Sequence, residues 1–266
     1  MPVDFAFLDS GTGGIPYLLH LEKKCPGAEC VYLADTRNFP YGEKSSGEII
    51  RSSVAAAGIL VDRFSPAAVI VACNTISVTA LDDIRRAFPE VRIVGTVPAI
   101  KLAADVSVNR RIGLLATNAT VGNPYNMRLK DEFAPDCELV PRGDSELVSF
   151  VEHRAFTASE AECEQAVRPA VEFFRSRGCD TIILGCTHFL NLADTIRRVA
   201  GEGIRVVDSR DGVVRRALSV HPCVQDGILS RRNPRLFVTG FSDGKDEAEY
   251  GLICRRFSLD WGGILG

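Results

Sequence analysis

The sequence lacks long hydrophobic runs, and no apolar stretch approaches the roughly 20 residues that a helix needs to span a bilayer. It also lacks, at its start, the basic segment followed by a long apolar segment that is typical of a secretion signal. These absences argue against a membrane association. We therefore expect a cytoplasmic protein.

Positive charge is not in excess, because the sequence has 31 lysines and arginines but 34 aspartates and glutamates, which gives a formal net charge of -3. Binding of a nucleic-acid backbone needs clustered lysines and arginines, so we expect no nucleic-acid partner. The basic pairs Arg85-Arg86 and Arg231-Arg232 are interpreted as solvent-exposed. With 46% hydrophobic residues, the composition is that of a folded globular protein.

No CxxC pair occurs among the nine cysteines. The closest spacing, Cys25 to Cys30, has no second pair of cysteines or histidines, so a structural zinc site is not predicted and we expect no metal. Because the reducing cytoplasm keeps cysteines unpaired, all nine are interpreted as thiols.

Asp9-Ser10-Gly11-Thr12-Gly13-Gly14 has neither the spacing of a GxGxxG dinucleotide loop nor the lysine of a GxxxxGK[ST] nucleotide loop. Neither NAD nor ATP is therefore predicted. Its glycines let backbone amides approach an anion at the start of a helix that Pro16 helps to begin, and a small carboxylate fits such a turn.

Short apolar runs followed by turns and helical periodicity recur along the chain, which predicts an α/β fold with a mainly parallel sheet. Ser45 with Glu48, and Thr157 with Glu160, predict capping-box starts of two helices. The predicted strands are residues 5–8, 30–34, 68–72, 92–95, 112–116, 137–140, 181–184, 204–207 and 236–238.

One layout occurs twice in the chain. FAFLDSGTGG is followed later by AVIVACNT, and RIGLLATNAT is followed later by TIILGCTH. In each half, one strand ends in a loop of small hydroxyl residues and a later strand ends in a cysteine followed closely by a threonine. Parallel sheets bind ligands beyond the carboxyl ends of their strands, so these loops can converge on one ligand if the halves face each other.

Cys73 and Cys186 each lie between a predicted buried strand and a predicted helix, beginning near Ile76 and Leu190, where unpaired helix amides favour a thiolate. Two such cysteines facing one ligand can remove a proton from carbon and return one to the opposite face. A regulatory disulfide between them, and acyl transfer with His188 as the base of Cys186, are the alternatives. The other seven are interpreted as structural or incidental thiols: Cys25, Cys30, Cys137, Cys163, Cys179, Cys223 and Cys254.

Small polar residues accompany both cysteines, and their amides and hydroxyls suit carboxylate and ammonium groups. Each alone could equally be a helix cap. The residues are Asn74, Thr75, Thr117, Thr120 and Thr187.

Six segments in this order, FLDSGTGG, LADTRNFPYG, VIVACNT, IVGTVPAI, GLLATNAT and IILGCTH, resemble the glutamate racemase family, within the aspartate/glutamate racemase group. The resemblance covers most of the chain. It implies two pseudo-symmetric, open, mainly parallel α/β domains with the active site in the cleft between them. The implied domains are residues 1–96 plus 210–266, and residues 97–209.

The resemblance also assigns roles. It implies that Cys73 and Cys186 are the catalytic acid/bases, that Asp9 and His188 assist them, and that Glu152 is an assisting acid on the Cys186 side. Asp144-Ser145 stands where the family pattern has Cys-Pro. It implies that the substrate is held by Ser10, Tyr41, Gly42, Asn74, Thr75 and Thr187. We expect Asp9, Thr117, Thr120 and His188 to belong to the substrate-binding residues as well. Without the resemblance, Tyr41 reads as a surface aromatic and Glu152 as an exposed helix charge.

The implied activity is interconversion of L- and D-glutamate without a cofactor, supplying D-glutamate for peptidoglycan, in a protein expected to be a homodimer. No lysine, Lys101 and Lys130 included, lies in a motif suited to pyridoxal phosphate. Three alternatives remain open: a racemase for aspartate or another amino acid, a decarboxylase or isomerase that uses one or both cysteines, and a non-enzymatic carboxylate-binding protein.

Overall fold

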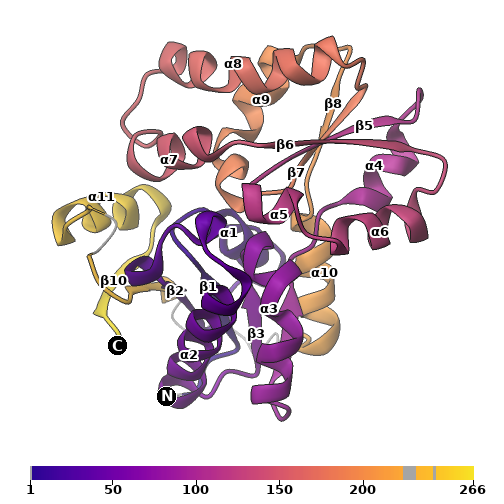
Figure 1. Cartoon of the computed structure of the whole chain (residues 1–266). Coiled ribbons are helices and arrows are strands. Elements are labelled where there is room, and N and C mark those ends of the chain that lie inside the picture. Colours follow the sequence, from indigo (N-terminus) through magenta and orange to yellow (C-terminus); the bar gives the residue numbers. More distant parts are fainter. Residues whose placement is uncertain (1, 224–231, 242–243) are drawn as a thin grey trace. The chain divides into compact units, whose positions relative to one another are not determined.

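The computed structural model describes residues 2–223, 232–241 and 244–266, and the chain divides into two compact units (Figure 1). The first unit comprises Met1–Thr96 and Arg210–Gly266, and the second comprises Val97–Ser209. Each has its own parallel sheet. This α/β architecture confirms the predicted fold class.

The sheet of the first unit has the order β10-β9-β2-β1-β3-β4 in the described residues. Its strands are β1 (Phe5–Asp9), β2 (Cys30–Ala34), β3 (Ala68–Val71), β4 (Arg92–Gly95), β9 (Arg235–Val238) and β10 (Asp260–Ile264), all paired in parallel. β1 and β3 are buried along their whole length, which is why they read as continuous apolar runs rather than alternating ones.

The helices of the first unit cover both faces of this sheet. α1 (Ile15–Lys24) connects β1 to β2 on one side, and α2 (Ser46–Phe64) leads back past β1 to β3 on the other side. Right-handed crossovers that run in opposite directions lie on opposite faces. Accordingly, α1 packs on α10 (Arg210–Val220), whereas α2 packs on α3 (Asn74–Ala87). α11 (Glu247–Phe257) precedes β10 and packs on it.

The sheet of the second unit, β6-β5-β7-β8, repeats the β2-β1-β3-β4 order of the first. Its strands are β5 (Arg111–Ala116), β6 (Glu138–Gly143), β7 (Thr181–Leu184) and β8 (Arg205–Val207). α4 (Ile100–Val106) packs on α6 (Tyr125–Phe133), and α8 (Glu160–Ser176) packs on α9 (Ala193–Ala200) (Figure 1). α5 (Asn118–Val121) and α7 (Ser145–His153) follow β5 and β6. The repeat seen in the sequence is therefore a repeat of strand order.

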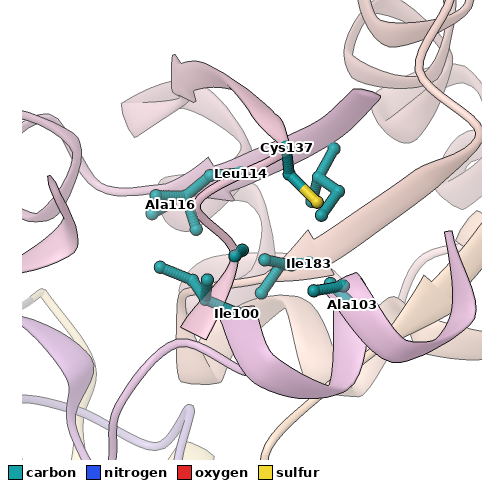
Figure 2. Close-up of a cluster of buried hydrophobic side chains, with 9 residues drawn as sticks. Ile100, Ala103, Leu114, Ala116, Cys137 and Ile183 are labelled. Atoms are coloured by element: carbon teal, nitrogen blue, oxygen red, sulfur yellow. The ribbon is translucent and has the colours of Figure 1, made fainter. Parts of the chain in front are cut away.

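A cluster of buried hydrophobic side chains joins α4 to β5 and β7. Figure 2 shows Ile100 and Ala103 of α4 facing Ile183 of β7, with Leu114 of β5 beside them, and all four are buried. Cys137 belongs to this core as a small apolar side chain, as predicted. Close packing of this kind fixes the strands whose carboxyl ends carry the polar loops.

All nine predicted strands are present, with ends displaced by at most a few residues. β10 was missed because Asp260–Ile264 contains two glycines and begins with a charge. These glycines have structural reasons: Gly263 adopts a φ of +93° at a register shift against β9, and a side chain at Gly262 would collide with the Phe237 ring. β10 is an edge strand whose irregular register hides its period.

Two predicted helix starts were wrong. α8 is capped by Ser159 with Glu162, whereas the Thr157 hydroxyl donates to the Arg154 carbonyl in the preceding turn. The helix expected from Leu190 begins at Ala193, after a 3₁₀ segment, Thr187–Leu192. The capping box of Ser45 and Glu48 at the start of α2 is confirmed.

The prediction that all nine cysteines are thiols is also wrong, because Cys25 and Cys223 form a disulfide with Cα atoms 5.7 Å apart. Cys25 ends α1 and Cys223 follows α10, and these two helices pack together. The pairing depends on the tertiary fold, because the partners are 198 positions apart in the sequence. The other seven cysteines are buried thiols.

Arg85, Arg86 and Arg232 are exposed, as predicted, while Arg231 lies outside the described residues. Within the described ranges, none of the helices combines the length and hydrophobicity needed to cross a bilayer.

Candidate functional site

The first cluster of polar residues, called here the Cys73 site, lies at the carboxyl ends of β1 and β3 and consists of Asp9, Ser10 and Cys73. Cys73 is the N-terminal flanking residue of α3, so its sulfur lies beside the positive end of a 14-residue helix. The Ser10 hydroxyl is 3.8 Å from Cys73 Sγ and 3.4 Å from Asp9 Oδ1. A hydroxyl thus connects the thiol to a carboxylate.

Asp9 is fully buried and is held by several donors. Its Oδ1 accepts the Ser10 backbone N–H at 2.7 Å, and its Oδ2 accepts the Gly14 backbone N–H at 2.7 Å. The Tyr32 hydroxyl also donates to Oδ2, at 3.0 Å. The backbone amides of the glycine-rich turn therefore donate to the carboxylate of Asp9, a residue of the protein itself.

Tyr41 adjoins this cluster and is buried, contrary to its interpretation as a surface aromatic. Its hydroxyl donates to Asp35, which also accepts from Asn38 Nδ2 at 3.0 Å and from Thr239 Oγ1 at 2.7 Å. Burial raises the pKa of Tyr41 well above its ordinary range, and the charges of Asp35 and Cys73 add to this. Tyr41 is therefore a neutral phenol in a fixed orientation.

Asn74 has an unusual environment for an amide. It is 2% exposed, and neither its Oδ1 nor its Nδ2 has a hydrogen-bond partner among the described residues. Buried polar atoms are nearly always paired, so the unpaired amide next to Cys73 is a candidate contact for a polar ligand. Thr75 follows it and is buried, and Gly42 lies half-buried beside Tyr41.

The second cluster, called here the Cys186 site, lies at the carboxyl end of β7 and consists of Cys186, His188 and Glu152. His188 Nδ1 is 3.6 Å from Cys186 Sγ, and His188 Nε2 is 2.8 Å from Glu152 Oε2. Residues two apart on a turn between a strand and a helix need not face each other, but the structure brings Cys186 and His188 together. Glu152 is 1% exposed, not an exposed helix charge.

The charge of His188 follows from its neighbours. Burial alone would lower the pKa of His188, but hydrogen bonds and charges from Cys186 and Glu152 outweigh it and raise the pKa well above its ordinary range. The raised pKa favours the imidazolium form of His188, between a sulfur and a carboxylate. Such an arrangement can compensate a thiolate and can supply a proton.

Thr117 and Thr120 lie at the carboxyl end of β5, in the second unit. The Thr117 hydroxyl accepts the Thr120 backbone N–H at 3.2 Å and donates to Thr120 Oγ1 at 2.9 Å. Thr117 is therefore a helix cap, the simpler of its two interpretations, which leaves a role in binding open. Thr187, next to Cys186, is buried.

Residues that sequence reasoning did not single out include Tyr32, Asp35 and Thr239. Tyr32 and Asp35 reach the site from β2 and the segment after it, and Thr239 follows β9. A buried tyrosine usually has a hydrogen-bond partner for its hydroxyl, and this was the one available signal for Tyr32. The described residues contain no group of three or more His, Cys, Asp or Glu side chains arranged to hold a metal ion.

Comparisons with known proteins identify one family. The family model described as Asp/Glu/Hydantoin racemase matches residues 19–217. The glutamate racemase of Treponema pallidum (strain Nichols) is 40% identical over 98% of this chain and 96% of its own length. That of Proteus mirabilis is 37% identical over 78% of this chain and 72% of its own length.

Solved structures give the same result. The crystal structure of Escherichia coli glutamate racemase in complex with L-glutamate and the activator UDP-MurNAc-Ala has a TM-score of 0.83 at 30% identity, covering 100% of this chain and 99% of that one. Glutamate racemase from Aquifex pyrophilus has a TM-score of 0.72 at 30% identity, covering 98% and 97%.

Proposed function

Because the chain belongs to the Asp/Glu/hydantoin racemase family and is an amino-acid racemase, we propose that it interconverts L- and D-glutamate by a two-base mechanism that uses Cys73 and Cys186. The observation that carries the proposal is the repeated position of the two cysteines. Each follows the strand next to the first strand of its unit, and each has its own polar partner for proton exchange.

Glutamate is proposed because relatives that match 98% of the chain at 40% identity are glutamate racemases and one neighbour was solved with L-glutamate. The residues around Cys73 support a small polar substrate. The unpaired Asn74 amide offers a donor and an acceptor, and the Tyr41 phenol is neutral and oriented. The proposed substrate-binding residues are those expected from the sequence: Asp9, Ser10, Tyr41, Gly42, Asn74, Thr75, Thr117, Thr120, Thr187 and His188.

In the proposed mechanism, one cysteine as thiolate takes the α-proton and the other as thiol donates a proton to the opposite face of the carbon. This requires the two units to act as two domains, residues 1–96 plus 210–266 and residues 97–209, that present their cysteines to one substrate. Hydrogen bonds to the α-carboxylate would stabilise the enediolate charge that develops in the transition state. Asp9 and His188, with Glu152 behind it, exchange protons with the two thiols.

We propose further that the reaction needs no added cofactor, that the protein is cytoplasmic and homodimeric, and that its D-glutamate serves peptidoglycan synthesis. These statements rest on the resemblance to the family. Activity of purified protein after dialysis against a chelator, without pyridoxal phosphate, tests the first of them.

The deciding experiment follows optical rotation and the α-proton NMR signal together, with L-glutamate in deuterated buffer. The parent protein is expected to lose both. Cys73→Ser and Cys186→Ser should each reduce racemisation by about 10²- to 10⁴-fold, the range for loss of an acid/base group. Cys254→Ser, a change at a free buried cysteine outside both sites, is the control and should racemise at the parent rate.

Racemisation at the parent rate in both cysteine variants would overturn the two-base mechanism. Exchange of the α-proton without inversion would mean that one cysteine alone acts. If glutamate is unchanged but L-aspartate is racemised, the mechanism stands and the substrate assignment is wrong.

A further inference from the structure

Tyr32 of β2 lies beneath the Cys73 site and has no exposed surface. Its ring stacks against Phe7, with ring centroids 6.4 Å apart and planes 15° from parallel. Its hydroxyl lies 3.0 Å from each of three atoms: Asp9 Oδ2, the Gly11 carbonyl oxygen and the Gly14 backbone nitrogen. A phenylalanine would fill the same apolar space, so the hydroxyl has a separate purpose.

The surrounding turn is fitted to this hydroxyl. A side-chain carbon at Gly14 would lie 2.9 Å from the Tyr32 oxygen and 2.5 Å from the Ala72 carbonyl oxygen, closer than such atoms can approach. Gly14 thus allows its own N–H to reach both Asp9 Oδ2, at 2.7 Å, and the Tyr32 oxygen. The turn, the tyrosine and the carboxylate form one buried hydrogen-bonded unit.

The hydroxyl has one proton and two acceptors at equal distance, Asp9 Oδ2 and the Gly11 carbonyl. When Asp9 is charged, its carboxylate is the stronger acceptor and takes the hydrogen bond. When Asp9 is neutral, the proton can turn to Gly11, and the hydroxyl donor stays satisfied. Tyr32 can therefore support both protonation states of Asp9 without leaving a buried polar group unpaired.

A proton path leads from Cys73 to this unit. The thiol can pass its proton to Ser10 Oγ while the Ser10 hydroxyl proton passes to Asp9 Oδ1. The Sγ–H bond breaks, an Oδ1–H bond forms, and Ser10 stays neutral. Asp9 changes from carboxylate to carboxylic acid, and reversal of the step restores the thiol.

We propose that Tyr32 is a positioning residue that holds Asp9 toward Ser10 and Cys73 in both of its protonation states. The inference rests on the proposed function, because it assigns Tyr32 to the proton exchange of one of the two proposed bases. Cys73 is a second titratable group connected to Asp9, through the Ser10 hydroxyl.

Tyr32→Phe in the full-length protein tests the inference. We expect kcat for glutamate to fall about tenfold to a hundredfold, the effect of losing one hydrogen bond to a charged group, with KM within about twofold of the parent. Because Asp9 loses a donor that favours its charged form, the acidic limb of the kcat profile should move to higher pH. Tyr250→Phe removes another buried tyrosine hydroxyl of the same unit and should change neither.

The outcomes separate the two proposals. A parent protein that does not racemise glutamate would overturn the proposed function and this inference with it. An active parent whose kcat and pH profile are unchanged by Tyr32→Phe would overturn the role of Tyr32 alone.

If Tyr32→Phe does not fold, 3,5-difluorotyrosine incorporated at position 32 keeps the shape and makes the phenol a stronger donor. The acidic limb should then move to lower pH, opposite to the shift expected for phenylalanine. A limb that coincides with that of the parent would overturn the inference.

Discussion

In the first unit, the cysteine that follows β3 has a serine hydroxyl 3.8 Å from its sulfur, whereas in the second unit the cysteine that follows β7 faces an imidazole nitrogen at 3.6 Å. The strand orders that position them are the same. Behind the hydroxyl is a carboxylate held by backbone amides and a phenol. Behind the imidazole is a buried glutamate.

This difference shows what a repeated fold does and does not determine. The strand order determines where a thiol stands, at the end of a buried strand and the start of a helical segment. The neighbouring loops determine how its proton is handled. The Cys73 site joins its thiol to a carboxylate through a serine hydroxyl, whereas the Cys186 site places an imidazole between its thiol and a carboxylate, so the two sites should respond differently to pH and to loss of charge.

Among changes to the polar partners of the two cysteines, the largest effect is expected when the Cys186 site loses its anion. Glu152→Gln keeps the shape but removes the charge that stabilises the His188 imidazolium, and breaking a buried charged pair costs several kcal/mol. We expect kcat to fall about a hundredfold, measured by polarimetry with glutamate. Glu164→Gln, which breaks a surface pair with Arg198, is the control and should stay within about twofold of the parent.

The same variant has a pH signature. The pKa of His188 is raised above its unfolded value, so its imidazolium is complete at low pH and is lost as pH rises through the folded pKa. Removing Glu152 lowers that pKa, and the alkaline limb of kcat should move to lower pH. At the Cys73 site, by contrast, Tyr32→Phe is expected to move the acidic limb of the kcat profile. An unchanged alkaline limb in Glu152→Gln would remove the proposed contrast between the sites.

A smaller effect is expected at Tyr41. Asp35→Asn retains the size of the side chain but weakens the acceptor for the Tyr41 hydroxyl, which then loses its fixed orientation. KM for glutamate should rise about tenfold and kcat should change less than about threefold, since one hydrogen bond to a charged group contributes roughly this much. Asp83→Asn, at a surface pair with Arg86, is the control. If the KM of Asp35→Asn equals that of the parent, Tyr41 does not take part in substrate binding.

Much of this arrangement could be predicted from local sequence. Buried strands appear in the sequence as apolar runs. A cysteine that closely follows such a run lies at the carboxyl end of the strand, as Cys73 and Cys186 do. The resemblance to the racemase family is confirmed by the relatives. It also directed attention to Glu152, whose contact with His188 spans 36 positions in sequence and has no local signal.

The remainder depends on contacts between distant segments. Thr239 reaches Asp35 across about 200 residues, and Cys25 meets Cys223 because two helices pack together. Period and composition describe one element at a time, so they cannot show which elements meet. The prediction that Thr157 caps α8 was wrong for a different reason. Two capping-box patterns overlap in the sequence, and the structure uses the later one, Ser159 with Glu162.

The smallest predicted effect tests whether the scaffolds of the two units are equivalent where the sites differ. Ser45 caps α2 in the first unit and Ser159 caps α8 in the second, each in a box with a glutamate three residues on. Ser45→Ala and Ser159→Ala should each destabilise their helix by about 1 kcal/mol, seen as faster amide hydrogen exchange in the first turn, while Thr157→Ala should have little effect. If Ser45→Ala and Ser159→Ala reduce helix stability equally, the units differ only in the polar partners of their cysteines. If Thr157→Ala reduces helix stability as much as Ser159→Ala does, the assigned start of α8 is wrong.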